Sequence, residues 1–212
     1  MSTESEKNFI NELKFDVIKD KVKKFLFIHL NTIISCAVIL LCIIFISVFI
    51  NFYKNNKIEN YNEKIFLALN SNDIIEELEK IYNNKSTPRI SKTFAGIKLI
   101  EELTDNEKIK DIYKEIFENE KDVFFKSYAG LNLITILINE ENFDEKYINE
   151  LFSILDNGKN PLQDLVLEQK VIFLIKQDNK NEAKTIVNNL LRRNADNANT
   201  VERLNKYVEI LK

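Results

Sequence analysis

An uncharged, strongly apolar stretch is the feature of this sequence that most constrains its fold. No residue from Phe25 to Tyr53 carries a formal charge, and Ile33–Ile50 is apolar apart from two serines. A helix of roughly 20 apolar residues spans the hydrocarbon core of a bilayer, which is about 30 Å thick. A cleaved signal peptide fits poorly, because the stretch is too long for one and no small-residue cleavage site follows it. We therefore predict one transmembrane helix over residues 28–53.

The charges that flank this span predict its orientation. Six lysines precede it, whereas only Lys54, Lys57 and Lys64 follow it within a similar distance. The positive-inside rule then favours a cytoplasmic segment over residues 1–27 and places residues 54–212 on the other side of the membrane. An apolar stripe in the first segment predicts a short amphipathic helix, which lies on the lipid headgroups or docks a partner; the stripe consists of Phe9, Ile10, Leu13 and Val17.

Residues 54–212 have the pattern of an all-α domain. The whole chain has only three glycines and two prolines, which excludes a turn-rich all-β fold. Three segments carry apolar residues at helical spacing, and each pairs with an apolar inner helix before it to form a hairpin. The stripes are Ile109, Ile112, Tyr113, Ile116; Ile148, Leu151, Phe152, Leu155; and Ala183, Ile186, Val187, Leu190.

An internal repeat refines this prediction. Residues 93–100 match residues 127–134 position by position at an offset of 34, including the pairs Ala95-Gly96 and Ala129-Gly130. This offset equals the period of tetratricopeptide (TPR) hairpins. The small residues predict close helix packing, with an aromatic ring filling the space beside them. We expect a TPR-like α-solenoid that also includes hairpins over residues 58–83 and 161–194 and a C-terminal capping helix around Val201–Leu211.

Local signals predict where some of these helices begin and end. Thr87-Pro88 and Asn160-Pro161 each place a capping side chain before a proline, the pattern of a helix start. Gly158 is placed to end a helix in the left-handed conformation. No glycine or proline interrupts Phe25–Leu69, so the membrane helix is expected to continue into the first helix of the domain.

The sequence contains no recognisable catalytic arrangement. Its one histidine, His29, and its two cysteines, Cys36 and Cys42, lie in the uncharged stretch, and three glycines cannot build a phosphate-binding loop. Acidic pairs such as Glu101-Glu102 and Glu140-Glu141 lie on polar helix faces or at helix ends. Residues 54–212 have a net charge of −4, which does not suit nucleic acid. We predict no catalytic, cofactor-binding or metal-binding residues, no cofactor, and neither nucleic acid nor a small-molecule substrate as a partner.

The arrangement resembles the YfgM-like family of ancillary Sec-translocon subunits. The resemblance lies in the charged N-terminal segment, the single span, the Ala-Gly repeat at 95–96 and 129–130, and the turn at Asn181-Glu182-Ala183. It departs from the TPR consensus in having no tryptophan and a longer spacing between later repeats. The resemblance implies a non-enzymatic, single-pass protein of the bacterial inner membrane, whose periplasmic TPR domain works with translocon subunits and periplasmic chaperones.

These observations together favour a membrane-anchored protein-binding adaptor, because solenoids of paired helices bind peptides or helices of other proteins. One alternative is a TPR scaffold in cell-envelope assembly or division. A second alternative, from another class, is a membrane-tethered enzyme that uses a pair of carboxylates.

Overall fold

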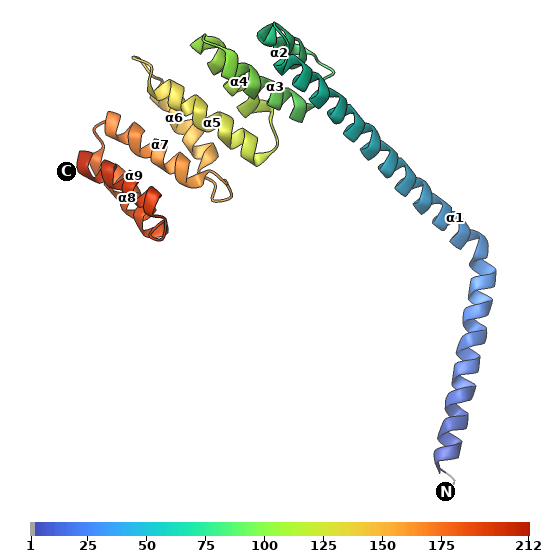
Figure 1. Ribbon diagram of the computed structural model, residues 1–212. Coiled ribbons are helices and arrows are strands. Elements are labelled where there is room, and N and C mark those ends of the chain that lie inside the picture. The colour runs from blue at the N-terminus through green and yellow to red at the C-terminus, as the bar shows by residue number, and fades with distance from the viewer. Residues whose placement is uncertain (1–2) are drawn as a thin grey trace. The chain divides into compact units, whose positions relative to one another are not determined.

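The described part of the chain is entirely helical. The computed structural model describes the backbone of residues 3–212, and the side chains of Lys19, Lys21, Lys23, Lys24 and residues 39–212. This part contains nine helices and no strand (Figure 1), which confirms the all-α prediction. The helices are α1 (Thr3–Leu69), α2 (Ile74–Asn83), α3 (Arg89–Glu102), α4 (Asn106–Asn119), α5 (Val123–Ile138), α6 (Glu145–Leu155), α7 (Gln163–Lys176), α8 (Lys180–Arg193) and α9 (Ala198–Ile210).

Helix α1 is unbroken from Thr3 to Leu69, so the predicted continuation of the apolar stretch into the first helix of the domain is confirmed. The chain divides into two compact units, Met1–Lys57 and Ile58–Lys212. The side chains of the predicted N-terminal stripe (Phe9, Ile10, Leu13 and Val17), and those of His29 and Cys36, lie outside the described residues.

One segment of α1, Ile39–Leu69, is long and apolar enough to cross a membrane, and none of its most apolar window is buried. Phe45 and Phe49 are 75% and 71% exposed, and their apolar neighbours are similarly uncovered. The core helix of a water-soluble protein buries such side chains, because each costs about 1.5–3 kcal/mol when it is left in water. The exposed surface is therefore the one that a lipid environment would cover.

The second unit has its apolar side chains inside. The predicted stripes of α4, α6 and α8 are buried, apart from Ile109 and Ile186, which are partly covered. The larger apolar cluster extends from Tyr61, Ile65 and Ala68 of α1 to Phe173 of α7. A smaller cluster holds α7, α8 and the C-terminal end together; its buried members are Val171, Leu174, Ala183, Val187 and Leu211.

The predicted close packing at the two repeated glycines is present. A Cβ atom built at Gly96 of α3 would lie 2.7 Å from the ring of Tyr82 on α2. A Cβ atom built at Gly130 of α5 would lie 2.7 Å from the ring of Phe117 on α4. Any larger side chain would therefore push the two helices apart. The neighbouring Ala129 is 1% exposed, as expected for an interior position.

This packing corrects the predicted pairing of helices. The sequence pairs α3 with α4 and α5 with α6, but α3 and α5 pack most closely on the helices that precede them, α2 and α4. The shortest approach at each glycine is to a ring of the preceding helix, Tyr82 at Gly96 and Phe117 at Gly130, so the missing side chain leaves room for that helix first. The predicted pairing of α7 with α8 is correct.

Polar contacts between helix ends show that successive helices run antiparallel. Two contacts join the N-terminal part of one helix to the C-terminal end of the next, and the third joins the C-terminal end of α8 to the start of α7. The ion pairs are Arg89–Glu120 (3.0 Å), Lys110–Glu140 (3.0 Å) and Arg193–Asp164 (3.0 Å).

The helix boundaries differ from the sequence signals at two prolines. Thr87 does not cap α3: its hydroxyl donates to the carbonyl of Ile81 at the end of α2. Asn160 likewise belongs to the turn before α7, where it accepts from the amide of Leu162 and donates to the carbonyl of Leu155. Both side chains are buried, and each bonds a carbonyl near the end of the preceding helix, which fixes the turn between the two helices. Gly158 is left-handed as predicted, with φ 67°.

Candidate protein-binding surface

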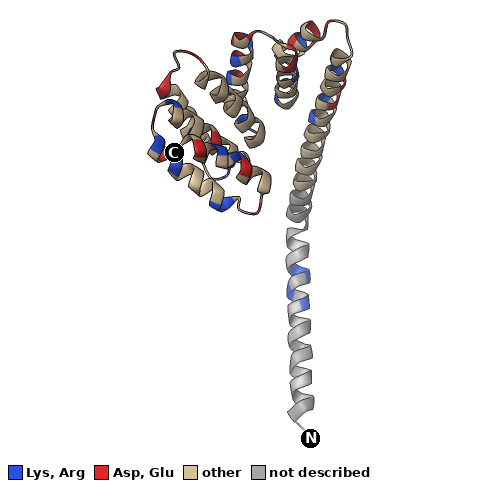
Figure 2. Cartoon of the chain, turned by 60° about the vertical axis from the view of Figure 1, so that its left-hand side comes forward, with Lys and Arg blue, Asp and Glu red and all other residues tan. Residues whose placement is uncertain are grey.

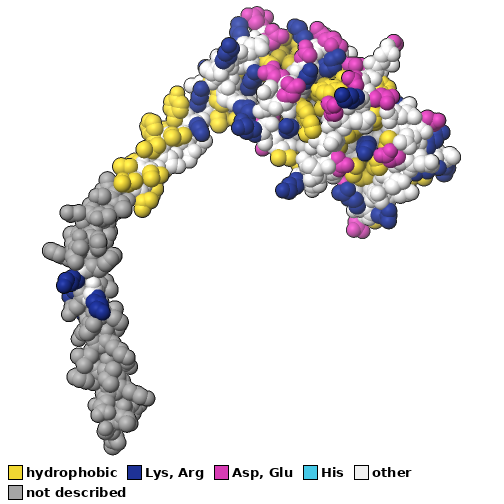
Figure 3. Space-filling view, turned by 180° about the vertical axis from the view of Figure 1, so that it is seen from behind, with side chains coloured by type: hydrophobic (Ala, Val, Ile, Leu, Met, Phe, Trp, Pro, Cys, Tyr) yellow, Lys and Arg dark blue, Asp and Glu magenta, His cyan; other side chains and the backbone are white. Residues whose placement is uncertain are grey.

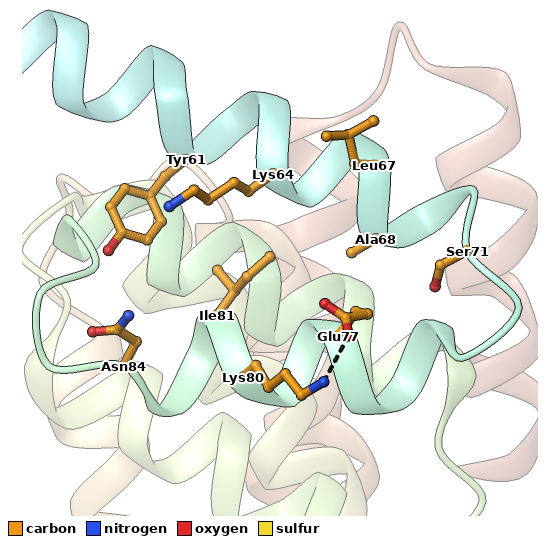
Figure 4. Close-up of a pocket in the computed structure, with 9 residues that line it drawn as sticks. All are labelled: Tyr61, Lys64, Leu67, Ala68, Ser71, Glu77, Lys80, Ile81 and Asn84. Atoms are coloured by element: carbon orange, nitrogen blue, oxygen red, sulfur yellow. Dashed lines mark hydrogen bonds and ion pairs between the residues drawn. The ribbon is translucent and has the colours of Figure 1, made fainter.

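A groove in the second unit lies between the last turns of α1 and helix α2 (Figure 4). It has a volume of about 510 Å³. Its α1 side consists of Tyr61, Lys64, Leu67, Ala68 and Ser71, and its α2 side of Glu77, Lys80, Ile81 and Asn84. The spacing along each helix is three or four residues, so one face of each helix forms one wall. From Tyr61 to Ser71 the groove is about 15 Å long, at 1.5 Å per helical residue.

The groove combines an apolar floor with a charged rim. Ala68 and Ile81 form the floor, and Lys80 on the rim is held by Glu77 (2.7 Å) and Glu76 (2.9 Å). The ammonium of Lys64 lies 4.7 Å from the centre of the Tyr61 ring. This pattern suits a helix or an extended peptide that offers apolar side chains and a few charges.

One large apolar side chain of the groove is open to solvent. Leu67 lines the groove and is 60% exposed. Phe66 is 66% exposed but does not line the groove, because the helical turn places it on the opposite side of α1. We refer to the groove, including Leu67, as the N-terminal edge.

A buried carboxylate joins three helices away from this edge. The side chain of Glu120, 1% exposed, accepts hydrogen bonds from Arg89 Nε (3.0 Å) and Thr93 Oγ1 (2.5 Å) of α3. It also accepts from the backbone amides of Lys121 (2.7 Å) and Asp122 (3.0 Å) at the start of α5. Burial alone would raise the pKa of Glu120, but these four hydrogen bonds outweigh burial and lower its pKa. Glu120 therefore holds the helices together as an ionised group.

A second carboxylate, Glu115 of α4, lies near Glu120 at a smaller cavity of about 220 Å³. It accepts from the hydroxyl of Tyr82 (2.6 Å) and from the ammonium of Lys92 (2.6 Å). Burial opposes ionisation of Glu115, yet the two hydrogen bonds together lower its pKa. Burial and the same carboxylate raise the pKa of the Tyr82 hydroxyl, which therefore stays protonated and acts only as a donor. This cluster positions helices and offers no activated base.

A second buried carboxylate holds the C-terminal helix. Glu168 of α7 is 8% exposed in its side chain, and Arg203 of α9 donates to both of its oxygens, at 2.8 and 2.7 Å. The planar guanidinium matches the carboxylate in a two-pronged pair, which is the strongest geometry for such a contact. The cluster thus fixes α9 on α7.

In each acidic pair considered in the sequence, one glutamate forms an ion pair with a lysine and the other is exposed. Glu101 is bound by Lys98 on its own helix (2.7 Å), and Glu140 by Lys110 (3.0 Å). Glu102 and Glu141 are exposed. In the described part of the chain, no group of three or more histidine, cysteine, aspartate or glutamate side chains is placed to hold a metal ion.

Sequence reasoning missed the two buried carboxylates, Glu120 and Glu168, for different reasons. Glu120 follows a striped helix and looks like an ordinary helix end. Glu168 interrupts an apolar run, and its partner Arg203 is 35 residues away on a helix whose packing the sequence does not fix. The sequence does contain a signal for another contact, because Lys92 and Lys126 are 34 residues apart, like the two glycines. The ammonium of Lys92 lies 4.9 Å from the centre of the Tyr82 ring, and that of Lys126 lies 5.1 Å from the centre of the Phe117 ring.

The surface of the second unit carries charges of both signs, distributed over its helices (Figure 2), with apolar patches between them on the face seen in Figure 3. A mixed surface of this kind suits contacts with proteins better than contacts with the uniformly charged backbone of a nucleic acid. In comparisons with protein families, curated proteins and solved structures, nothing matches this chain. The candidate site therefore depends on the geometry of the N-terminal edge.

Proposed function

We propose that this chain is a membrane-anchored adaptor that binds other proteins through a TPR-like array of helices. The observation that carries the proposal is the combination of an exposed apolar helix and a helical unit with an open groove. The first feature suits a lipid bilayer, and the second suits a peptide or helix of another protein. The recurrence of glycine and lysine at an interval of 34 residues, and of the ring at 35, supports the TPR-like assignment.

The proposed location is a bacterial inner membrane, with residues 1–27 in the cytoplasm and residues 54–212 in the periplasm. The excess of lysines before the span supports this orientation. Alkaline phosphatase fused after Lys212 should be active, because the enzyme matures only in the periplasm. An inactive fusion together with a fluorescent cytoplasmic reporter at the same position would reverse the topology and indicate a receptor that faces the cytosol.

The proposed partners are subunits of the Sec translocon and periplasmic chaperones, on the basis of the resemblance to YfgM-like proteins. Purification of tagged full-length protein in mild detergent, followed by mass spectrometry, tests this assignment. Translocon subunits should be enriched over a control that carries only residues 1–57. Enrichment of division or envelope-assembly proteins without any translocon subunit would favour the scaffold alternative. A reproducible turnover that is lost on mutating an acidic pair would favour the membrane-tethered enzyme.

A further inference from the structure

Four lysines cluster on α1 just before the uncharged stretch. All four side chains are exposed (Figure 2): Lys19, Lys21, Lys23 and Lys24. Asp20 is the only acidic residue among them, so four positive charges and one negative charge give this segment a net charge of +3. We refer to the four side chains as the lysine cluster.

The unbroken helix determines how far the lysine cluster lies from the proposed span. Lys24 and Lys19 precede residue 28, where the span is expected to begin, by four and nine residues. At 1.5 Å per residue, these separations are about 6 and 14 Å along the helix axis. The headgroup layer extends about 5–8 Å beyond the hydrocarbon core, and charges act over roughly 8–10 Å of water beyond that. The lysine cluster is therefore within reach of lipid phosphates, a step that rests on the proposed anchoring.

The lysines lie on opposite sides of α1. At about 100° per residue, Lys19 and Lys23 are about 40° apart around the helix, whereas Lys21 is about 160° from each of them. A helix that docks on one protein presents a single face to it. Charges on opposite sides instead suit a partner that surrounds the helix, as the lipids of a bilayer do.

We propose that the lysine cluster binds anionic phospholipids, so that headgroups of net negative charge gather around α1 on this side of the membrane. The ammonium groups donate hydrogen bonds to phosphate oxygens, and clusters of four or more lysines beside a membrane helix attract anionic lipids in this way. Anionic lipid is favoured over zwitterionic lipid because a zwitterionic headgroup brings its own positive charge next to the lysines. The anchor thereby determines which lipids lie next to it.

Native mass spectrometry of the full-length chain in nanodiscs tests the proposal. The bilayer contains equal amounts of phosphatidylglycerol, which is anionic, and phosphatidylcholine, which is zwitterionic, with the same acyl chains. The released protein should retain phosphatidylglycerol over phosphatidylcholine by roughly twofold to fivefold, because one lysine near an anionic surface changes association by about fivefold. Raising the ammonium acetate concentration from about 50 to about 500 mM should reduce this preference through screening. Equal retention of the two lipids would overturn the proposal.

Three variants separate the lysine cluster from charge elsewhere. Replacing all four lysines of the cluster by glutamine should abolish the preference, and replacing them by arginine should keep it. The matched control removes four exposed lysines from the second unit instead and should behave like the parent protein: Lys85→Gln, Lys159→Gln, Lys184→Gln and Lys206→Gln. Both faces of the nanodisc have the same composition, so a change in the direction of insertion does not alter the result.

The outcomes distinguish the lysine cluster from the anchor itself. A preference that survives glutamine, or that is lost with arginine or in the matched control, would contradict the assignment to the cluster. A chain that enters the bilayer without preferring either lipid counts against this inference alone, whereas a chain that does not enter the bilayer counts against the proposed function as well.

Discussion

At the scale of single residues, the second unit depends on places where two helices come unusually close. Gly96 and Gly130 each meet a ring from the helix before and an aliphatic side chain from the helix after, Ile112 at 3.2 Å and Leu155 at 3.1 Å respectively. The ammonium of a lysine one turn before each glycine lies 4.9 or 5.1 Å from the centre of the same ring. The glycines therefore contribute space rather than unusual backbone angles, since both lie within regular helices.

Gly130→Ala tests this role. The added methyl group would lie 2.7 Å from the Phe117 ring, which cannot withdraw because it is buried. We expect a loss of about 1–3 kcal/mol in the free energy of unfolding, even though alanine is the better helix former. Urea denaturation followed by circular dichroism measures this change. Adding Phe117→Leu should recover part of the loss, while Asn199→Ala on the exposed face of α9 should change little. A Gly130→Ala variant as stable as the parent protein would mean that the helices can separate freely.

Glu120→Gln tests the buried carboxylate. The pKa of Glu120 is lower in the folded protein than its ordinary value of 4.5, so the folded state binds fewer protons at this site. Its contribution to stability is therefore present above about pH 4.5 and is lost as the pH falls below that value. Urea unfolding measured between about pH 7 and pH 3 should show a steeper acid loss for the parent protein than for Glu120→Gln. A difference that stays constant with pH would show that the ionised form is not what matters.

The residue scale also shows what the sequence can and cannot predict. The interior position of Ala129 and Gly130 follows from small residues within an apolar helix, and the left-handed Gly158 follows from its place after a helix. The roles of Thr87 and Asn160 cannot be predicted from the sequence. A side chain that caps the next helix and one that bonds the end of the previous helix have the same sequence pattern, and only the position of the previous helix distinguishes them.

At the scale of helices, α9 combines apolar packing with one ion pair to a buried carboxylate. Leu204 and Leu211 are buried, but the carboxylate of Glu168 has only Arg203 as its described partner. The sequence predicts that this amphipathic helix exists and not where it binds. The periodicity of apolar residues identifies which face of α9 is buried. It does not identify the surface of α7 that receives α9, because that surface includes the charged side chain of Glu168 within an apolar run.

Arg203→Ala should therefore loosen α9. It leaves a nearly buried carboxylate without its partner, and we expect a loss of about 1–3 kcal/mol, less than for a fully buried pair because Arg203 is 47% exposed. Hydrogen exchange of α9 amides should accelerate more than that of α5 amides. The double variant Glu168→Leu/Arg203→Leu removes both charges and should regain most of the stability. If the double variant is as unstable as Arg203→Ala, packing rather than charge is the cause.

At the scale of the whole chain, α1 belongs to both units, and its last turns are part of the larger apolar cluster. Tyr61, Ile65 and Ala68 are all buried in that cluster. The sequence predicts this continuity because nothing interrupts the helix. The sequence places a boundary at residues 53 and 54, where the uncharged stretch ends, and the division by packing lies at residues 57 and 58.

Two truncations separate these roles. A chain of residues 58–212 lacks the exposed apolar surface and should stay in solution with a cooperative thermal transition. A chain of residues 70–212 also loses Tyr61, Ile65 and Ala68, which uncovers the buried side chains of Leu78 and Ile81 on α2. It should aggregate or melt at a clearly lower temperature, as measured by circular dichroism and size-exclusion chromatography. Equal behaviour of the two fragments would show that the last turns of α1 add nothing to the core.

The two similar helix contacts at Gly96 and Gly130 have a consequence for how such a gene can change in length. At both glycines a ring from the preceding helix packs against the helix that carries the glycine. The segment between Gly96 and Gly130 therefore begins and ends with the same kind of contact. An in-frame duplication of the codons for residues 97–130 would place Phe117 and Gly130 in a second copy of the same setting. Each duplicated segment would therefore bring its own glycine and its own ring to the added helix contact.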